Sequence, residues 1–307
     1  MYRGKKKQRE VKDPIPTTLD EFGYVLKDNG AVRSKTTDLL GDEVESRLKQ
    51  APYHFQSVTI PLEADPAKND PHTFFYMTPN ALTTTGKLLL LIPGTGTRIG
   101  QWSRRVLSEE SIQAGSMLNM VNKAKEYDYE VIIFNPNTIL WYDNAPQYLS
   151  PLQSSKTWSS IPGNESPENH CQYVFRHFVS QTQAEKIGII GLGWAGHCFT
   201  ELLNEHFDIF KSKVVGVALA NSNHSSRLIH GDDKRAWLDD HTVNWNLNSN
   251  EIAESVFDAE FGCKCINSDA ELPDYVLWQC TDDMMKFICT KMGDMEQEAE
   301  ENQVMIV

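Results

Sequence analysis

Short apolar runs alternate along the chain with segments whose apolar residues recur at helical spacing. The apolar runs cover residues 87–92, 130–134, 187–190 and 213–220. Runs of this length bounded by turn residues are typical of strands buried on both faces of a parallel sheet. The helical spacing is clearest after Ser166-Pro167, a capping residue followed by a proline suited to the first helical turn. The pattern predicts an α/β fold with a mainly parallel sheet and helices on both faces.

The flanking segments predict one domain with two tails. Residues 17–80 are expected to form an N-terminal layer, with a hairpin around Asn29-Gly30, a helix over 42–55 and strands at 57–62 and 73–77. We expect further helices at 116–127 and 282–292, a last strand at 261–266, and a long loop or cap at 138–165. The domain is expected to span 17–292, between a disordered basic tail at 1–16 and a disordered acidic tail at 293–307.

The stretch 186–203, KIGIIGLGWAGHCFTELL, places a buried strand, a glycine turn and a helix in succession. Gly191, Gly193 and Gly196 have the G-x-G-x-x-G spacing of dinucleotide sites, where a pyrophosphate lies at the helix N-terminus. The same order of parts is typical of the α/β-hydrolase elbow, whose tip carries a nucleophilic Ser. Here the tip residue is Gly193, which has no side chain.

Two features favour the hydrolase-like interpretation of this turn. A dinucleotide site needs an acidic residue at the end of the next strand, but that strand ends in Ala220-Asn221. Two other buried strands precede the turn, and the order of strand, glycine-rich loop, helix, strand, helix and elbow matches that of the hydrolases. The loops at the carboxyl ends of the strands are expected to form a pocket; its predicted residues are Gly94, Thr95, Gly96, Trp102, Trp194 and His224.

Other residues near these loops are candidates for chemistry. Cys198 follows the glycine turn, and a thiol near a helix N-terminus can have a lowered pKa. Ser222 and His224 follow the strand at 213–220. Ser222 is a candidate for a substitute nucleophile, and His224 is a candidate for contact with a ligand. A further hypothesis is an anion site made by the basic residues near the glycine-rich loop, Arg98, Arg104 and Arg105.

Composition narrows the class of protein. The 307 residues carry a net charge of −13, which argues against a broad nucleic-acid surface because phosphate binding needs clustered Lys and Arg. No apolar run approaches the length of a membrane span, and the start of the chain lacks the apolar core of a secretory signal. The six cysteines are therefore expected to be free thiols in the nucleus or cytoplasm, and their spacing does not favour zinc. We expect no cofactor and no metal.

Several long segments resemble the argonaute-binding-protein-two (Arb-two) family, in its animal cotranscriptional-regulator branch. The resemblance runs from about Leu19 to Phe287, and its most specific segments are LLLLIPGTGTRIGQWSRR (88–105), VIIFNPN (131–137), SPENHCQYVFRHF (166–178), GLGWAGHCFTELL (191–203) and VGVALANSNHS (215–225). The family resembles α/β-hydrolases, and its animal members carry a His-Ser-Tyr-Gly-Gly elbow. On that pattern Leu192, Gly193 and Trp194 stand in place of the His, Ser and Tyr.

Other catalytic-type positions also depart from the family pattern. Asn221 stands where the family commonly has Asp. Asp269 matches the acid of a Gly-Thr-Asp segment, but Ala270-Glu271-Leu272 follows where the family has a His. His224 and Asp269 persist, so the degenerate positions are Gly193 and Asn221 together with the missing His.

These departures predict a non-catalytic protein, and the resemblance implies a binding or scaffold role in nuclear gene regulation. Its implied processes are small-RNA silencing, heterochromatin formation and cotranscriptional splicing, with argonaute or chromatin factors as protein partners. Two alternatives remain open: a hydrolase that uses unconventional residues such as Ser222, His224 or Cys198, and a dinucleotide-binding protein.

Overall fold

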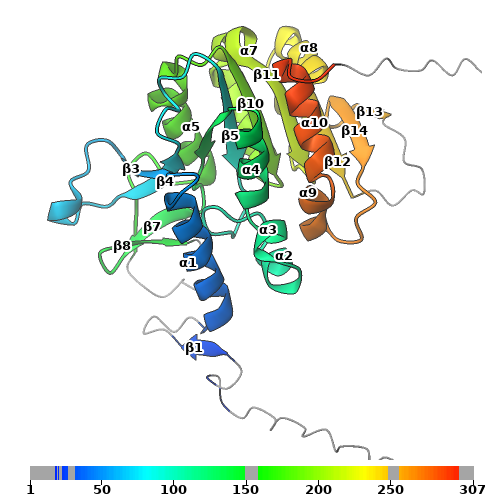
Figure 1. The fold of residues 1–307 in the computed structure, drawn as a ribbon. Coiled ribbons are helices and arrows are strands. Elements are labelled where there is room, and N and C mark those ends of the chain that lie inside the picture. Colours follow the sequence, from blue (N-terminus) through cyan, green and yellow to red (C-terminus); the bar gives the residue numbers. More distant parts are fainter. Residues whose placement is uncertain are drawn as a thin grey trace, which may run out of the picture.

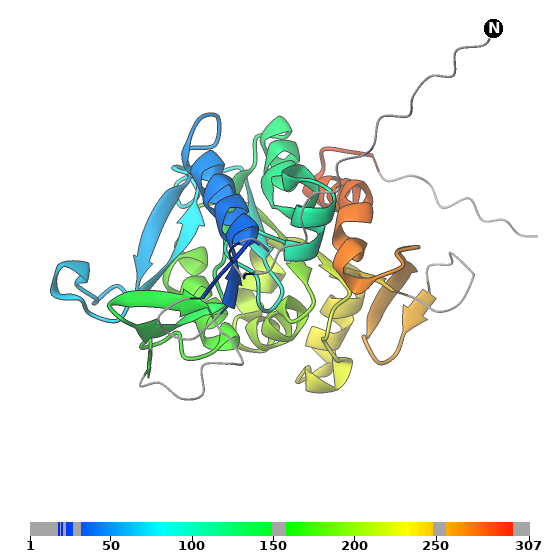
Figure 2. The same cartoon turned by 90° about the horizontal axis from the view of Figure 1, so that it is seen from below.

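The computed structural model describes residues 18, 20, 23–26, 32–148, 158–247 and 256–296. The expected basic tail, the residues of the Asn29-Gly30 turn and residues 297–307 of the expected acidic tail lie outside the described residues. In the described chain a mixed sheet lies between two layers of helices (Figures 1 and 2). The predicted α/β class is therefore confirmed.

The sheet has nine strands among the described residues. Their spatial order is β13 (Val256–Asp258), β14 (Cys263–Asn267), β12 (Thr242–Asn246), β11 (Val214–Ala220), β10 (Lys186–Leu192), β5 (Lys87–Ile92), β6 (Glu130–Ile133), β4 (Thr73–Met77) and β3 (Gln56–Ile60). The six strands from β14 to β6 pair in parallel, and antiparallel pairs close both edges. From β5 the chain moves to β6 on one side, whereas β10 lies on the other side. The order of strands thus reverses between β5 and β10, and ligands of such sheets bind at the carboxyl ends of the strands at such a point.

Each face of the sheet has its own apolar core. One core is formed with α1 (Lys35–Lys49), α2 (Arg104–Glu109), α4 (Leu118–Glu126), α9 (Val276–Gln279) and α10 (Thr281–Met292), and α3 (Ile112–Gly115) packs beside α2. The other is formed with α5 (Pro167–His177), α6 (Ala195–Glu205), α7 (Phe207–Lys213) and α8 (Asp232–His241). Short 3-10 turns in the described residues connect these parts: Pro66–Lys68, Val179–Gln181, Ser226–Leu228 and Pro273–Tyr275.

Local sequence signals account for several element ends. The Ser166 side chain accepts a hydrogen bond from the Asn169 N–H at 3.1 Å, and Pro167 occupies the first turn of α5. At the other end of the chain, α10 stops at Gly293, whose φ of 84° is the left-handed conformation favoured by glycine. Both ends were predicted from the sequence.

The N-terminal segments differ in part from the prediction. β1 (Tyr24–Leu26) and β2 (Val32–Ser34) form the expected antiparallel pair. The predicted helix at 42–55 instead begins at Lys35 and ends at Lys49, because Pro52 cannot continue the backbone hydrogen bonds. The strands β3 and β4 extend the main sheet and are not a separate covering layer.

The prediction of a loop or cap at 138–165 was wrong for its described residues. β7 (Thr138–Tyr142), β8 (Ala145–Tyr148) and β9 (Ser159–Ser160) form a second sheet, of three strands. Asp143 and Asn144 make the β7–β8 turn with φ values of 54° and 56°, as a tight hairpin requires.

Candidate functional site

The glycine turn predicted at 191–196 lies at the carboxyl end of β10, beside the point where the strand order reverses. β10 ends at Leu192, Gly193 takes a φ of +56°, and α6 begins at Ala195. The Gly193 N–H donates to the Ala220 carbonyl at 2.9 Å. The Gly193 carbonyl accepts from the N–H groups of Gly196, at 3.1 Å, and Asn223, at 3.0 Å. These bonds hold the turn in the shape of a strand-to-helix elbow.

Packing explains two of the three glycines of this turn, whereas Gly193 has a positive φ and no close neighbour. A Cβ on Gly191 would lie 3.0 Å from the Cβ of Ala195. A Cβ on Gly196 would lie 1.7 Å from the Ser222 Oγ, so only glycine allows α6 to approach the loop after β11. The G-x-G-x-x-G spacing therefore follows from the geometry of the elbow, without reference to a pyrophosphate.

The tip of the elbow has room for a side chain but carries none. Apart from its chain neighbours, the atom closest to a Cβ on Gly193 would be the Asn221 carbonyl oxygen, at 4.0 Å. The next residue, Trp194, is 36% exposed, and its Nε1–H donates to the carboxylate of Glu168 at the start of α5. The Trp194 ring also contacts the His197 ring, with centroids 4.7 Å apart. Trp194 is thus an exposed aromatic group held in one orientation beside the tip.

Glu168 is charged where it meets Trp194. Burial alone would raise its pKa, but hydrogen bonds from Ser166, the backbone and Trp194 lower the pKa of Glu168 below its ordinary value. The indole of Trp194 therefore donates to a carboxylate.

Ser222 and His224 lie behind the elbow and form a buried hydrogen-bonded chain. The Ser222 Oγ is 2.7 Å from the His224 Nδ1, and the His224 Nε2 is 3.6 Å from the Cys263 Sγ on β14. The exposed fractions of Ser222 and His224 are 5% and 2%. Burial lowers the pKa of His224 to about 4, so the imidazole is neutral near pH 7. The two residues are in contact as a nucleophile and a base would be. They are packed against Gly196, however, and are not exposed to solvent.

The loops after β11 and β14 bring Asn221 and Asp269 to the same edge of the sheet. Asn221 has a φ of 42°, and its N–H donates to the Trp245 carbonyl at 2.7 Å. Asp269 is exposed with a φ of 54°, and its N–H donates to the Asn267 side chain at 3.2 Å. Within the described ranges no hydrogen bond joins Asp269 to a histidine, so no acid–base pair is assembled there.

The glycine-rich loop after β5 is held by Asn137, a residue that the sequence analysis did not select. The Asn137 Nδ2 donates to the Gly94 carbonyl at 2.7 Å, and its Oδ1 accepts from the Gly96 N–H at 3.1 Å. Thr95, between these two glycines, is exposed. The signal that could have identified Asn137 is its place directly after a buried strand, in the segment Asn135-Pro136-Asn137.

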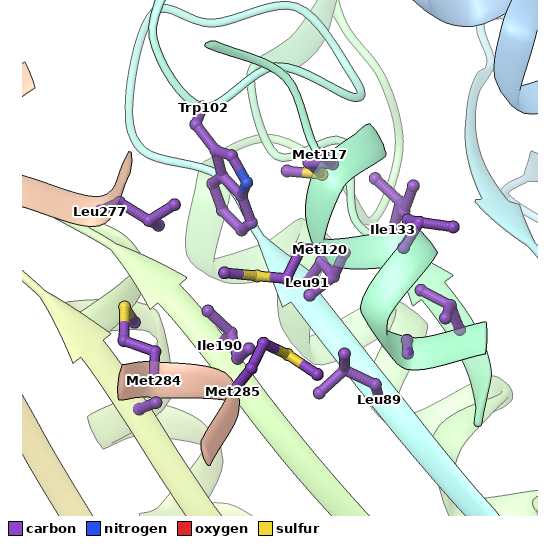
Figure 3. Close-up of a cluster of buried hydrophobic side chains, with 14 of the residues drawn as sticks. Leu89, Leu91, Trp102, Met117, Met120, Ile133, Ile190, Leu277, Met284 and Met285 are labelled. Carbon is purple, nitrogen blue, oxygen red and sulfur yellow. The ribbon is translucent and has the colours of Figure 1, made fainter. Parts of the chain in front are cut away.

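Trp102, predicted to line the pocket, is buried in the apolar core. It is 3% exposed and points into the core beside Met117 and Leu277, as Figure 3 shows. Its position is that of a packing residue. Cys198 is likewise buried, with 1% exposed, and contacts Cys171 on α5.

The three arginines near this loop do not form one cluster. Arg98 pairs with Glu45 and with Asp42, and Arg105 pairs with Glu109 on its own helix. Arg104 is exposed beside Gly96, and forms no ion pair with any residue that the structure places. At most one free cation is therefore available there for an anion.

The described part of the chain contains neither a cluster of metal-ligand side chains nor a helix suited to a membrane. No group of three or more His, Cys, Asp or Glu side chains has an arrangement suited to a metal ion within that part. None of the helices built from those residues is long and apolar enough to span a membrane.

Comparison with known proteins places these features in a family. The family model of the Arb2 domain matches residues 37–252. The "Cotranscriptional regulator ARB2A homolog" of Gallus gallus is 27% identical over 91% of this chain and 81% of its own. The "Cotranscriptional regulator ARB2A" of Homo sapiens is 25% identical over 89% of this chain and 80% of its own.

One solved structure has a fold similar to that of this chain. "A histone deacetylase from Saccharomyces cerevisiae" superposes with a TM-score of 0.53 at 16% identity, and the match covers 83% of this chain and 97% of that one. At this identity the likeness concerns the fold alone. The family match covers well over half of the chain and includes the elbow, the loops after β5 and β11 and most of the sheet. The chain belongs to the Arb2 domain family.

Proposed function

We propose that this protein is a non-catalytic, α/β-hydrolase-like binding module that acts in nuclear gene regulation. The observation that carries the proposal is the elbow itself, which keeps the turn and its hydrogen bonds but presents Gly193 at the tip. Acyl-transfer chemistry of the hydrolase type needs a nucleophile, a base and an orienting acid within reach of one another. Among the described residues of this edge, the tip carries no nucleophile, and Ser222 and His224 are buried.

The regulatory part of the proposal rests on relatives. The chicken and human proteins that match most of this chain are named cotranscriptional regulators. We extend that role to this chain, with small-RNA silencing, heterochromatin formation or cotranscriptional splicing as the processes. Argonaute or chromatin factors are the expected partners, in the nucleus or shared between the nucleus and the cytoplasm.

The surface proposed for binding is centred on Trp194. A large aromatic side chain that is exposed and oriented by a hydrogen bond loses little conformational entropy when a partner covers it. Such residues frequently contribute most of the affinity of an interface.

The experiment is quantitative affinity purification from nuclear extract with the full chain as bait. Trp194→Ala is compared with Leu228→Ala, an exposed apolar residue (43%) near the other end of α6, where Asn204 binds its carbonyl. We expect nuclear regulatory proteins with the wild-type bait, a loss of about tenfold or more with Trp194→Ala, and no change with Leu228→Ala. Recovery of no nuclear partner by the wild-type bait would overturn the proposal, and equal recovery by all three baits would overturn the role of Trp194.

The second candidate function is hydrolysis that uses Ser222 as nucleophile. The 2.7 Å contact between the Ser222 Oγ and the His224 Nδ1 favours it, because an adjacent imidazole activates a serine. Burial opposes it, since a substrate carbonyl must reach the Oγ, which Gly196 covers. Turnover of a panel of acyl esters that disappears in Ser222→Ala, His224→Ala or Cys198→Ala would establish this function in place of the first.

A further inference from the structure

One side of α6 carries a surface row of aromatic and acidic side chains, made of Trp194, His197 and Glu201. Trp194 precedes the helix with helical backbone angles, φ −63° and ψ −18°, so the three residues lie on one helical face. The Trp194 and His197 ring centroids are 4.7 Å apart, and the His197 Nε2 lies 3.7 Å from the Glu201 Oε1. Both ends of the row face solvent, because the exposed fractions of Trp194 and of the Glu201 side chain are 36% and 44%.

The row lies in a negatively charged part of the surface. Glu168, at the start of α5, accepts the hydrogen bond of the Trp194 indole, and Glu205 follows Glu201 on α6. Arg176 of α5 forms an ion pair with Glu205, at 3.5 Å. Glu201 forms an ion pair with no lysine or arginine of the residues that the structure describes. The charge of the row is therefore not neutralised by the two helices that carry it.

The pKa of Glu201 reflects this excess of negative charge. Burial raises the pKa of Glu201, and the charges of Glu168 and Glu205 raise it as well. The contact with His197 lowers the pKa but is outweighed. A cation beside Glu201 would offset the repulsion between these carboxylates. Charge complementarity therefore favours a cationic partner for the row over a neutral or anionic one.

We propose that this row binds an arginine-containing segment of a partner protein, with one guanidinium stacked on the Trp194 indole and a second paired with Glu201. The inference rests on the binding function proposed above and names the chemistry of its partner. A guanidinium is planar, stacks on aromatic faces and forms forked hydrogen bonds with carboxylates. The ammonium of lysine is a compact and strongly hydrated charge, which matches an aromatic face less well.

Glu168 supports the first of these two positions. Its carboxylate takes hydrogen bonds from Ser166, from the backbone and from the Trp194 indole. A carboxylate has about four acceptor positions, so one remains for a guanidinium that lies on the adjoining ring. The same carboxylate thus orients the aromatic platform and attracts the cation that covers it.

The spacing of the two positions favours arginines that are three residues apart. From Trp194 to Glu201 the helix rises about 10.5 Å, at about 1.5 Å for each residue. A polyproline II segment advances about 3.1 Å for each residue and has three residues in a turn. Residues three apart in such a segment lie on the same side, about 9.3 Å from each other. The sequence pattern that fits the row is therefore Arg-x-x-Arg.

Isothermal titration of the full chain with a synthetic peptide tests the inference. The probe is the acetylated and amidated peptide Gly-Gly-Arg-Gly-Gly-Arg-Gly-Gly, at an ionic strength of about 0.15 M. Two matched peptides replace both arginines by lysine or by citrulline, a neutral side chain of the same shape. Trp194→Ala and Glu201→Gln remove the two proposed contacts. Glu126→Gln is the control, because it removes the same charge from an exposed position of α4, on the other face of the sheet.

We expect the arginine peptide to bind more tightly than the lysine peptide, and about tenfold more tightly than the citrulline peptide. Affinity for the arginine peptide should fall about tenfold in Trp194→Ala. It should fall about threefold in Glu201→Gln and stay unchanged in Glu126→Gln. The inference is overturned if the wild-type chain does not bind the arginine peptide or binds the lysine or citrulline peptide equally well. It is also overturned if Glu201→Gln and Glu126→Gln weaken binding to the same extent.

The affinity purification described above separates this inference from the proposed function. If the Trp194→Ala bait loses nuclear partners while the arginine peptide does not bind the wild-type chain, the binding function stands and the arginine site is wrong. If the wild-type bait recovers no nuclear partner while the peptide binds through Trp194 and Glu201, the arginine site stands and the nuclear function is wrong.

Discussion

Gly196 shows how a single missing methyl group shapes the elbow. Its absent Cβ leaves space for the Ser222 Oγ, which in turn contacts His224, so that one glycine sets the distance between α6 and the loop after β11. A glycine in a G-x-G-x-x-G pattern is thus explained here by the approach of a helix to a loop.

Substitution of Gly196 tests this role. In Gly196→Ala the new Cβ would lie 1.7 Å from the Ser222 Oγ, and we expect a loss of about 1–3 kcal/mol in the free energy of unfolding from overpacking. Gly196→Ala combined with Ser222→Ala should recover part of the loss, because the clashing oxygen is removed. Urea unfolding measures both; an unchanged stability in the single variant would contradict the packing account.

Two buried histidines make stability depend on pH. His170 accepts a hydrogen bond from the Asn135 N–H at 3.0 Å and contacts the Asn164 side chain, also at 3.0 Å. Burial lowers the pKa of His170 to about 3 and that of His224 to about 4, from an ordinary value of 6.5. Below pH 6.5 the unfolded chain therefore binds protons that the folded chain does not bind. The contribution of these histidines to the free energy of unfolding is complete above that pH and is lost as the pH decreases.

The expected slope is about 1.4 kcal/mol per pH unit for each histidine over the range between its folded and unfolded pKa values. Free energies of unfolding at pH 6 and pH 5 measure it. The slope of the free energy of unfolding against pH should be smaller in His170→Gln than in the wild type, by the contribution of about one proton. This difference should appear whatever the stability of the variant at pH 7. An equal slope in the two proteins would show that His170 is not neutral in the fold.

At the scale of elements, the end of α10 is bound to the starts of three neighbouring central strands. Lys87 of β5 forms an ion pair with Asp294, Tyr129 beside β6 donates to the same carboxylate, and Lys186 of β10 donates to the Met292 carbonyl at 2.8 Å. Burial would raise the pKa of Asp294, but the hydrogen bonds from Lys87 and Tyr129 lower it. The carboxylate therefore stabilises the last helix in its place on the sheet.

Asp294→Ala should lower the free energy of unfolding by about 1–3 kcal/mol, because Tyr129 and Lys87 lose a charged partner. Glu296→Ala, two residues further, is the control and should leave stability within about 0.5 kcal/mol of wild type. Thermal and urea unfolding distinguish the two variants; similar small effects in both would rule out the anchoring role.

The elements that the sequence predicted are those whose patterns are locally unambiguous. β5, β6, β10 and β11 appear as apolar runs, and α5 begins at its Ser166-Pro167 signal. β12 was missed because Asn244 interrupts its apolar pattern. The Asn244 side chain is fully buried, and its Oδ1 accepts a hydrogen bond from the Ser222 N–H at 3.4 Å. This contact with a distant segment satisfies the buried amide, which the local sequence pattern does not indicate.

From the sequence alone, the site could be predicted only as far as the loops that form it. Gly193 at the tip and the absence of an acid at Asn221 could be read directly from the chain. The burial of His224 and Trp102, and the role of Asn137 in holding the glycine-rich loop, depend on contacts between distant segments that carry no local signal.

At the scale of the whole molecule, the loops of the sheet lie at the edge where hydrolases of this fold act, but the described residues of that edge do not assemble an exposed nucleophile with a base and an acid. The loops after β5, β10, β11 and β14 meet there, with Gly193 at the tip and Ser222 and His224 behind it. The architecture is retained because buried strands and glycine packing specify it, independently of the tip residue. Such a fold remains available for binding when the tip of its elbow carries no side chain.

Covalent labelling of the full-length protein with a fluorophosphonate, read by intact mass, tests this central claim most directly. Such a reagent reacts with a serine that an adjacent base has activated. Because Gly193 offers no hydroxyl and Ser222 is enclosed, we predict an unmodified mass after incubation. A stoichiometric adduct that is lost in Ser222→Ala would contradict the account and identify an active hydrolase.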